Sequence, residues 1–185
     1  GYRCGLECGM ASSSTPPPLS PRHWPLWLGI GVVALLARLP WPLQRVLGRG
    51  LGGLLRLAWR SRREVAIRNL ELCFPELDAQ QRSRLLHAHY DALGIGLFEF
   101  ARAWWGSVGP MRRGLVLEGL EHLEAARANG RGAIIVSGHF TTLELCGRLL
   151  AERVPLAGMY RPHAQPALEC AVLHGRLRYA AGMFT

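Results

Sequence analysis

The first strongly apolar stretch of the chain is Trp24–Ala37, which contains no charged residue. It is shorter than the roughly 20 residues that a helix needs to cross a bilayer. Apolar residues continue beyond it, but Arg38, Pro40 and Pro42 interrupt them. An apolar stretch flanked by tryptophan and followed by arginines is typical of a tilted single span or of a helix in the membrane interface. We therefore expect residues 24–58 to form a membrane anchor or an interfacial helix.

The next part of the chain, residues 59–110, is predicted to be helical. Glu64–Leu72 and Ala79–Trp105 have helical patterns, and Phe74-Pro75 separates them. In the second stretch the apolar residues cover more than one narrow stripe of the helix. Aromatic residues gather at its end and either pack in the core or line an acyl-chain pocket or interfacial belt: Phe98, Phe100, Trp104 and Trp105.

Residues 111–185 have a different pattern, in which short apolar runs alternate with helical stretches. Strand–helix–strand order of this kind predicts an α/β core with a parallel sheet. Gly132–Val136 is an apolar, β-branched run between turn residues, and we expect it to be a buried strand. The other expected elements are a short strand at Leu115–Leu117, a helix at Leu120–Ala128 that ends at Asn129-Gly130, a helix at Thr141–Glu152 and a strand at Val154–Tyr160.

The composition is basic and rather apolar. The net charge is +9, 49% of the residues are hydrophobic, and every basic residue other than histidine is arginine. The sequence has no zinc-finger, helix-turn-helix or RNA-binding pattern, so we expect no nucleic-acid partner. Apolar stretches between the arginines fit an anionic bilayer surface better. By the positive-inside rule, the arginines after the apolar stretch place the downstream chain in the cytoplasm: Arg56, Arg60, Arg62, Arg63 and Arg68.

The N-terminal residues 1–23 form a Ser/Pro-rich segment that is predicted to be a disordered tail. Five cysteines without close pairing in the main body argue against a disulfide framework and favour reduced thiols in the cytosol. Cys4 and Cys8 have no second ligand pair after them, which disfavours a metal site there.

The most informative segment for chemistry is Val136–Glu144, in which His139 follows the predicted strand and Glu144 lies at the start of the next helix. Catalytic groups in open α/β sheets gather at the carboxyl ends of strands. With His139 in the turn and Glu144 in the first helical turn, the two side chains can converge. Glu144 would then fix the imidazole tautomer, and the other ring nitrogen would remove a proton from an alcohol.

Two other interpretations of this segment stay open at this level. Thr141 to Glu144 matches a capping box, in which the glutamate serves only its own helix terminus. A metal hydrolase would need a third ligand besides His139 and Glu144, which His163 or His174 would have to supply. A histidine and a carboxylate five residues apart are a weak signal on their own.

Longer motifs make the signal specific. The runs RNLELCFPEL (68–77), LGIGLFEFARAWW (93–105), GLEHLEAA (119–126), GAIIVSGHFTTLEL (132–145) and MYRPHAQPALE (159–169) occur in this order. Together they resemble the lipid A biosynthesis lauroyl/myristoyl acyltransferases of the lysophospholipid acyltransferase superfamily, whose signature is a His, four residues, and then Asp or Glu. The resemblance extends from about Trp24 to the end of the chain.

This resemblance implies an enzyme that moves a fatty acyl group from acyl carrier protein to a hydroxyl of a lipid A precursor, at the cytoplasmic face of the inner membrane. His139 would be the general base and Glu144 would orient it, with no cofactor and no metal. Arg161 would bind phosphate or another negative charge, with Arg176 and Arg178 as weaker candidates for the same role. An arginine-rich surface also fits the acidic acyl carrier protein.

The family continues beyond the motifs found here, so we expect a C-terminally truncated member with an incomplete α/β acyltransferase core. The alternative is a catalytically inactive membrane-attached fragment or a lipid-binding module, in which the arginines bind anionic lipid.

Overall fold

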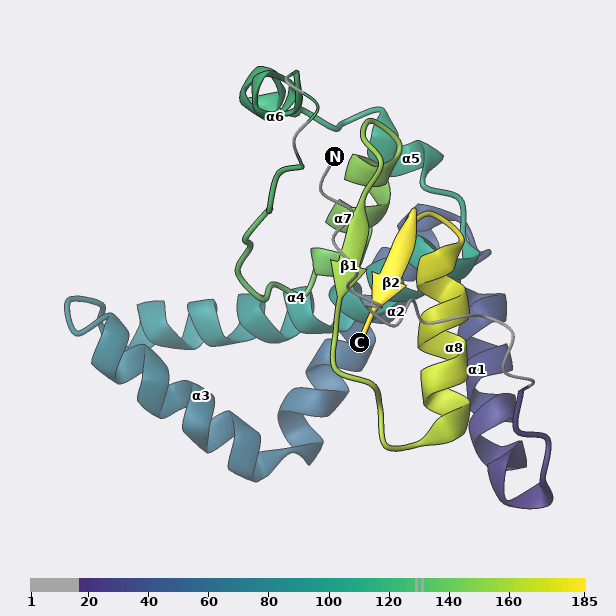
Figure 1. Cartoon of the computed structure of the whole chain (residues 1–185). Coiled ribbons are helices and arrows are strands. Elements are labelled where there is room, and N and C mark those ends of the chain that lie inside the picture. The colour runs from purple at the N-terminus through teal and green to yellow at the C-terminus, as the bar shows by residue number, and fades with distance from the viewer. Residues whose placement is uncertain (1–16, 129, 131) are drawn as a thin grey trace.

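The computed structural model describes residues 17–128, 130 and 132–185, and within these ranges helices dominate (Figure 1). Most of the predicted disordered tail, together with Cys4 and Cys8, lies outside the described residues, while Cys73, Cys146 and Cys170 are free thiols. The elements are a 3-10 turn at Pro21–His23, α1 (Trp24–Leu36), α2 (Trp41–Ala58), α3 (Arg60–Cys73), α4 (Ala79–Trp105), α5 (Gly109–Arg112), α6 (Leu120–Arg127), α7 (Leu143–Ala151), β1 (Ala157–Met159), α8 (Pro166–Leu177) and β2 (Gly182–Phe184).

The apolar N-terminal stretch folds into two helices with a turn between them. Helix α1 ends at Leu36, and Pro40 is extended (ψ 139°) before α2 begins. No helix in the described ranges is long and apolar enough to cross a membrane, so the structure does not support the expected single span.

Buried polar contacts hold this corner together. The side chain of Gln44 is fully buried, and its amide nitrogen donates to the carbonyl oxygens of Leu36 (2.7 Å) and Leu39 (3.2 Å). Arg102, from the far end of α4, donates to the same Leu39 oxygen (2.7 Å) and to Oε1 of Gln44 (2.9 Å). Burial lowers the pKa of Arg102. Because buried donors and acceptors that lose their partners are costly, this cluster fixes the α1–α2 corner against α4.

Helices α2 and α4 cross at glycines. A Cβ atom added to Gly52 would lie 2.1 Å from the carbonyl oxygen of Tyr90, and one added to Gly94 would lie 2.0 Å from the carbonyl oxygen of Gly48. No side chain fits at either position, so the two backbones are in direct contact there. Close approach through small residues is a common way to pack helices tightly.

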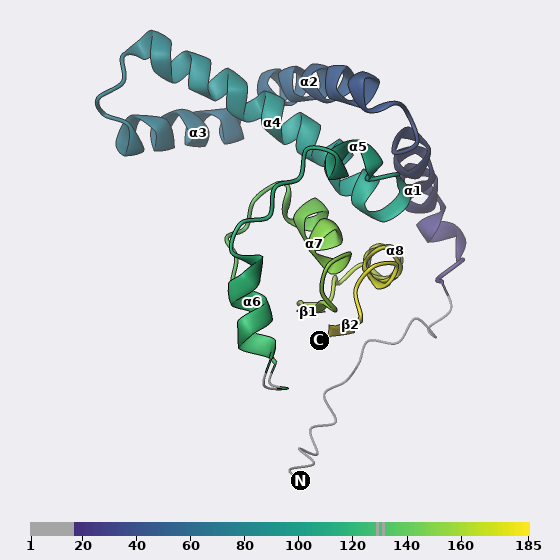
Figure 2. The same cartoon turned by 90° about the horizontal axis from the view of Figure 1, so that it is seen from above.

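The prediction of a helix over Ala79–Trp105 is confirmed, and the structure explains where it begins. Asp78 accepts a hydrogen bond from the Gln81 backbone (2.7 Å), and the Gln81 side chain accepts one from the Asp78 backbone (2.8 Å). This reciprocal capping box stabilises the first turn. Helix α3 and the first part of α4 form a hairpin whose tip projects away from the rest of the described chain in Figure 1 and Figure 2.

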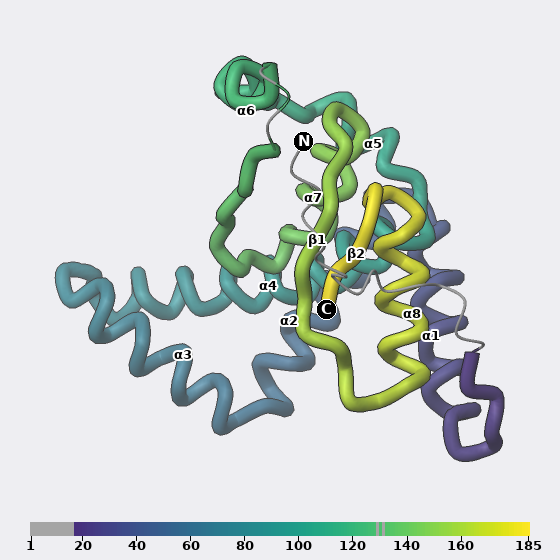
Figure 3. The backbone as a smooth tube through the Cα atoms, viewed as in Figure 1, coloured from purple at the N-terminus to yellow at the C-terminus, as the bar shows by residue number. Residues whose placement is uncertain are grey.

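The predicted α/β character is confirmed only in a small C-terminal unit. Strands β1 and β2 are parallel, with Ala157 opposite Gly182 and Met159 opposite Phe184. Helix α8 connects them, and the chain path from β1 through α8 back to β2 can be followed in Figure 3. Strand β1 lies within the predicted strand Val154–Tyr160 but is shorter.

Two of the strand predictions are wrong. Residues 115–117 and 132–136 have no regular structure, and the expected buried strand leaves Ile134 94% and Val136 90% exposed. A β-branched run becomes a strand only where a neighbouring strand accepts its hydrogen bonds, and the described sheet consists of β1 and β2 alone. The helix predicted at Leu120–Ala128 is confirmed as α6, and Gly130 after it has the left-handed backbone (φ 70°) expected of a helix stop.

The glycine contact predicts how α2 responds to single methyl groups. We expect Gly52→Ala to lower the free energy of unfolding by about 1–3 kcal/mol, because the new methyl group overlaps the Tyr90 carbonyl. Gly53, the next residue, has no atom within 4 Å of an added Cβ. Gly53→Ala should therefore raise stability by about 0.5–1 kcal/mol through helix propensity. Chemical denaturation of the two variants checks this, and equal effects at both positions would contradict the proposed backbone contact.

Candidate functional site

Glu144 lies near the start of α7, with only 8% of its surface exposed. Its oxygen Oε2 accepts hydrogen bonds from Nε1 of Trp104 (2.9 Å) and from the hydroxyl of Tyr179 (2.9 Å). Its other oxygen, Oε1, accepts from Nε of Arg176 (3.0 Å) and also from the Nη2 atom of the same guanidinium, forming an ion pair. Three side chains that lie 32 to 40 residues from Glu144 in the sequence therefore converge on its carboxylate.

These partners are supplied by helix ends. Trp104 is at the end of α4, Arg176 is in the last turn of α8, and Tyr179 lies two residues beyond α8. Helix α8 can approach because residue 175 is glycine: an added Cβ there would lie 2.4 Å from Cδ2 of Trp104. The indole is thus packed against a bare helix backbone while its N–H points to Glu144.

The site keeps Glu144 ionised. Burial by itself raises the pKa of this carboxyl, but hydrogen bonds from Arg176 and Trp104, the charge of Arg176 and the Tyr179 hydroxyl outweigh it, so the pKa lies below 4.5. Burial and the neighbouring carboxylate raise the pKa of Tyr179 above its usual 10, so the phenol remains a donor. The Arg176 pKa is raised by Glu144 despite the opposing effect of burial.

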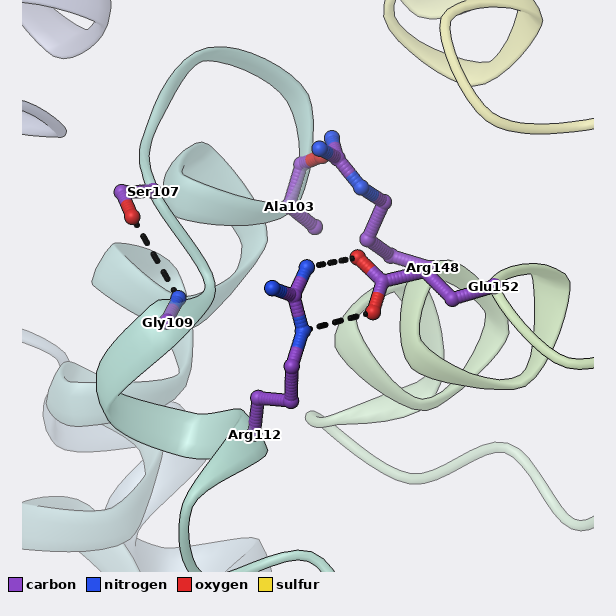
Figure 4. Close-up of polar contacts among 6 residues, drawn as sticks. All are labelled: Ala103, Ser107, Gly109, Arg112, Arg148 and Glu152. Carbon is purple, nitrogen blue, oxygen red and sulfur yellow. Dashed lines mark hydrogen bonds and ion pairs between the residues drawn. The ribbon is translucent and has the colours of Figure 1, made fainter.

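Helix α7 is itself fixed to the preceding helices (Figure 4). Arg112 of α5 donates to both oxygens of Glu152 at the end of α7 (2.9 and 2.6 Å). Arg148 of α7 donates to the carbonyl oxygen of Ala103 (2.8 Å). The hydrophobic core contains residues of α4, α7 and α8 together with Val108, which precedes α5: Ala103, Trp104, Val108, Leu145, Leu149 and Val172. The carboxylate of Glu144 is therefore attached to a well-packed helix.

A second polar cluster lies next to the first. Tyr160 follows β1, and its hydroxyl donates to Oε1 of Glu169 in α8. The backbone N–H of His163 donates to Oε2 of the same carboxylate (2.8 Å). Arg176 connects the two clusters, because its guanidinium carbon lies 5.1 Å from the centre of the Tyr160 ring. Burial and the Glu169 carboxylate raise the pKa of Tyr160 to about 12.

His139 lies on an exposed segment before α7. Within the part of the chain that the structure describes, no hydrogen bond joins His139 to Glu144; the carboxylate is brought together with Arg176 instead. The capping-box interpretation of Glu144 is wrong, because the N-cap of α7 is Thr142 instead of Thr141 and makes no side-chain hydrogen bond to the helix. The role of His139 as a general base stays a prediction.

The three predicted anion-binding arginines are placed differently from one another. Arg161 is exposed on the loop between β1 and α8, and Arg178 is exposed at the end of α8. Arg176 is half-buried and paired with Glu144, so its guanidinium supports the carboxylate. Among residues 17–128, 130 and 132–185, no group of three or more His, Cys, Asp or Glu side chains is arranged to hold a metal ion.

The sequence patterns did not single out Trp104 or Tyr179 as partners of Glu144. Trp104 was expected to pack in the core or line a pocket, and its indole indeed packs in the core (2% exposed) while its N–H serves the site. A signal for Tyr179 is its position three residues after Arg176, which brings both side chains to one side of the end of α8.

Comparison with known proteins agrees with the sequence motifs. Residues 14–185 match the family described as bacterial lipid A biosynthesis acyltransferase. The chain is 39% identical over 160 residues to the lipid A biosynthesis lauroyltransferase of Escherichia coli K12, which covers 86% of this chain and 52% of that protein. The palmitoleoyltransferase of the same organism is 36% identical with the same coverage, and its myristoyltransferase is 27% identical over 80% of this chain and 46% of that protein.

The chain thus spans about half the length of the curated relatives it matches. No solved structure matches it significantly.

The Glu144 cluster predicts a specific dependence of stability on pH. Since folding lowers the pKa of Glu144 below 4.5, its ionised form stabilises the fold above that pH, and the contribution disappears as the pH falls through the lowered value. We expect Glu144→Gln to lower the free energy of unfolding by about 3 kcal/mol at pH 7, because Arg176 loses its buried partner. The difference between parent and variant should shrink below pH 4.5 in denaturation experiments.

The control is Glu71→Gln, which removes an exposed ion pair with Arg68 on α3. Glu71→Gln should lower the free energy of unfolding by less than about 1 kcal/mol. If Glu144→Gln lowers the free energy of unfolding no more than this control does, the contacts of Glu144 do not stabilise the fold as we expect.

Proposed function

Since the chain belongs to the family of bacterial lipid A biosynthesis acyltransferases, we propose that it carries the catalytic pair of an enzyme that transfers a fatty acyl group from acyl carrier protein to a hydroxyl of a lipid A precursor. His139 is the general base, and Glu144 orients it and stabilises the imidazolium. The observation that supports this most directly is the buried Glu144 carboxylate, which Arg176 and its other donors keep charged five residues after the histidine.

In the proposed reaction His139 removes the proton from the acceptor hydroxyl as its oxygen attacks the acyl carbonyl carbon. The bond from that carbon to the sulfur of the carrier breaks, and the thiol leaves with a proton from the imidazolium. An ionised carboxylate lowers the energy of the imidazolium that forms between these steps. No covalent acyl-enzyme, cofactor or metal is needed. The ring of His139 has to approach Glu144 for this role, and the exposed segment that carries it is not packed into the core.

Arg161 is proposed to bind a phosphate or another negative charge of the lipid. Its exposed position between β1 and α8, within reach of solvent and next to the Tyr160–Glu169 cluster, supports this role. Arginine suits phosphate because its planar group forms two parallel hydrogen bonds. Arg178 is the weaker candidate, and Arg176 acts through Glu144.

The inner membrane is the proposed location, with the catalytic part at its cytoplasmic face. Helix α2 presents glycine and Gln44 to α4, while large apolar side chains on its other side are exposed, among them Val46 (63%) and Leu57 (62%). Arg45, Arg49 and Arg56 accompany them on the same helix. An apolar face with arginines along one edge suits an anionic lipid surface, and the remaining arginines suit the acidic acyl carrier protein.

The catalytic assignment predicts a large effect at one histidine. In the intact enzyme, His139→Ala should lower kcat for acyl transfer from acyl carrier protein by at least about 100-fold, because a positioned general base contributes this much or more. His122→Ala is the control, since His122 lies on α6 with an exposed side chain. Undiminished activity of His139→Ala would refute the assigned base.

Pairing of the two residues is tested by a double variant. If His139 and Glu144 act as one unit, His139→Ala combined with Glu144→Gln should be about as slow as His139→Ala alone. Multiplied rate losses in the double variant would show that the two side chains act independently.

The lipid surface proposal predicts a separable binding defect. Val46→Glu combined with Leu57→Glu should reduce binding to vesicles containing anionic lipid by at least about tenfold, because two charges replace the apolar contact. Val116→Glu, at an exposed apolar position outside α2, serves as control. Sedimentation with vesicles measures this, and unchanged binding would exclude α2 as the lipid contact. Vesicle binding without acyl transfer by the intact protein would favour the alternative of a lipid-binding module.

A further inference from the structure

Glu169 holds two points of the loop that carries Arg161. Its carboxylate lies in the first turn of α8 and accepts from the Tyr160 hydroxyl at the start of the loop and from the backbone N–H of His163, two residues after Arg161. Arg161 lies between these two tethered residues, with Pro162 beside it. One carboxylate therefore holds the loop on both sides of Arg161.

Tyr160 is fixed by more than this hydroxyl contact. Its backbone N–H donates to the carbonyl oxygen of Phe184 (3.0 Å), which extends the pairing of β1 with β2. Its ring packs against the hydrophobic core and lies under the guanidinium of Arg176. The ring thus supports the arginine that binds Glu144, while the hydroxyl reaches Glu169 on the other side.

We propose that Glu169 is a positioning residue, which sets the Arg161 loop for the anionic group of the acceptor and, through Tyr160, steadies the Arg176–Glu144 pair. This inference rests on the proposed function of Arg161 and Glu144. Glu169 does not touch the reacting atoms. Its effect is to reduce the conformational freedom that the loop loses when Arg161 binds an anion, which lowers the cost of binding.

Positioning of the Arg161 loop and support of the Arg176–Glu144 pair should contribute to the kinetics to different extents. Without Glu169 the loop loses both tethers, so binding of the phosphorylated acceptor should weaken more than the chemical step. Tyr160 retains its backbone bond to Phe184 and its packing, so Arg176 keeps most of its support. The larger change is therefore expected in KM for the acceptor and the smaller one in kcat.

The test uses the intact enzyme with a phosphorylated lipid acceptor. Glu169→Ala should raise KM for the acceptor by about three- to tenfold, the cost of ordering one or two more groups on binding, with a smaller fall in kcat. Glu169→Gln keeps one carbonyl oxygen as acceptor and should lie between parent and Glu169→Ala. Tyr160→Phe removes one tether but leaves the ring beneath Arg176, so it should raise KM without lowering kcat. Glu71→Ala, on α3, is the matched control and should leave both unchanged.

A readout that does not depend on activity separates this inference from the proposed function. In Glu169→Ala, hydrogen exchange of a peptide covering residues 160–165 should become faster, because the His163 amide loses its acceptor, while α2 and α4 exchange as in the parent protein. Unchanged exchange in this peptide, or an unchanged KM alongside faster exchange, would overturn the inference. If the parent enzyme transfers no acyl group, the proposed function fails, and the exchange experiment still decides whether Glu169 orders the loop.

Discussion

The ionised carboxylate of Glu144 is the constraint on which the C-terminal half of this chain depends. A buried charge is tolerated only with a counter-charge and enough hydrogen bonds. Meeting this demand requires the end of α4, the start of α7 and the end of α8 to meet at one point, because Trp104 comes from α4 while Arg176 and Tyr179 come from the end of α8. The glycine at 175 and the packing of Trp104 follow from the same requirement.

Local patterns predicted the helices well and the strands poorly, for a physical reason. Helix α4 agrees with the sequence from its first residue to its last, since helical hydrogen bonds are formed within the segment and Asp78 and Gln81 cap it locally. A strand depends on a partner elsewhere in the chain. The run 132–136 has the composition of a buried strand, yet no described strand pairs with it, and its side chains remain exposed.

The candidate site was predictable in part. The motif containing His139 and Glu144 identified the carboxylate, and the family follows from longer motifs, but spacing along the sequence carries no information about contacts between distant segments. Arg176 illustrates this limit: the sequence suggested a phosphate ligand, whereas the fold pairs the residue with Glu144. Trp104 likewise has the composition of a core residue, and only the arrangement of α4 against α7 reveals the second use of its N–H.

Helix α2 has to satisfy two different surroundings with one amphipathic sequence. On one side Gly48 and Gly52 must lack side chains, since they meet the backbone of α4, and Gln44 one turn earlier must reach Arg102. The opposite side carries leucine and valine side chains, among them Val46 and Leu57, that remain exposed. Because Gln44, Gly48 and Gly52 occupy the side that meets α4, most of the large apolar side chains of α2 lie on the exposed side. The apolar face of α2 is therefore left uncovered by the way this helix packs, and it is the surface that we propose as a lipid contact.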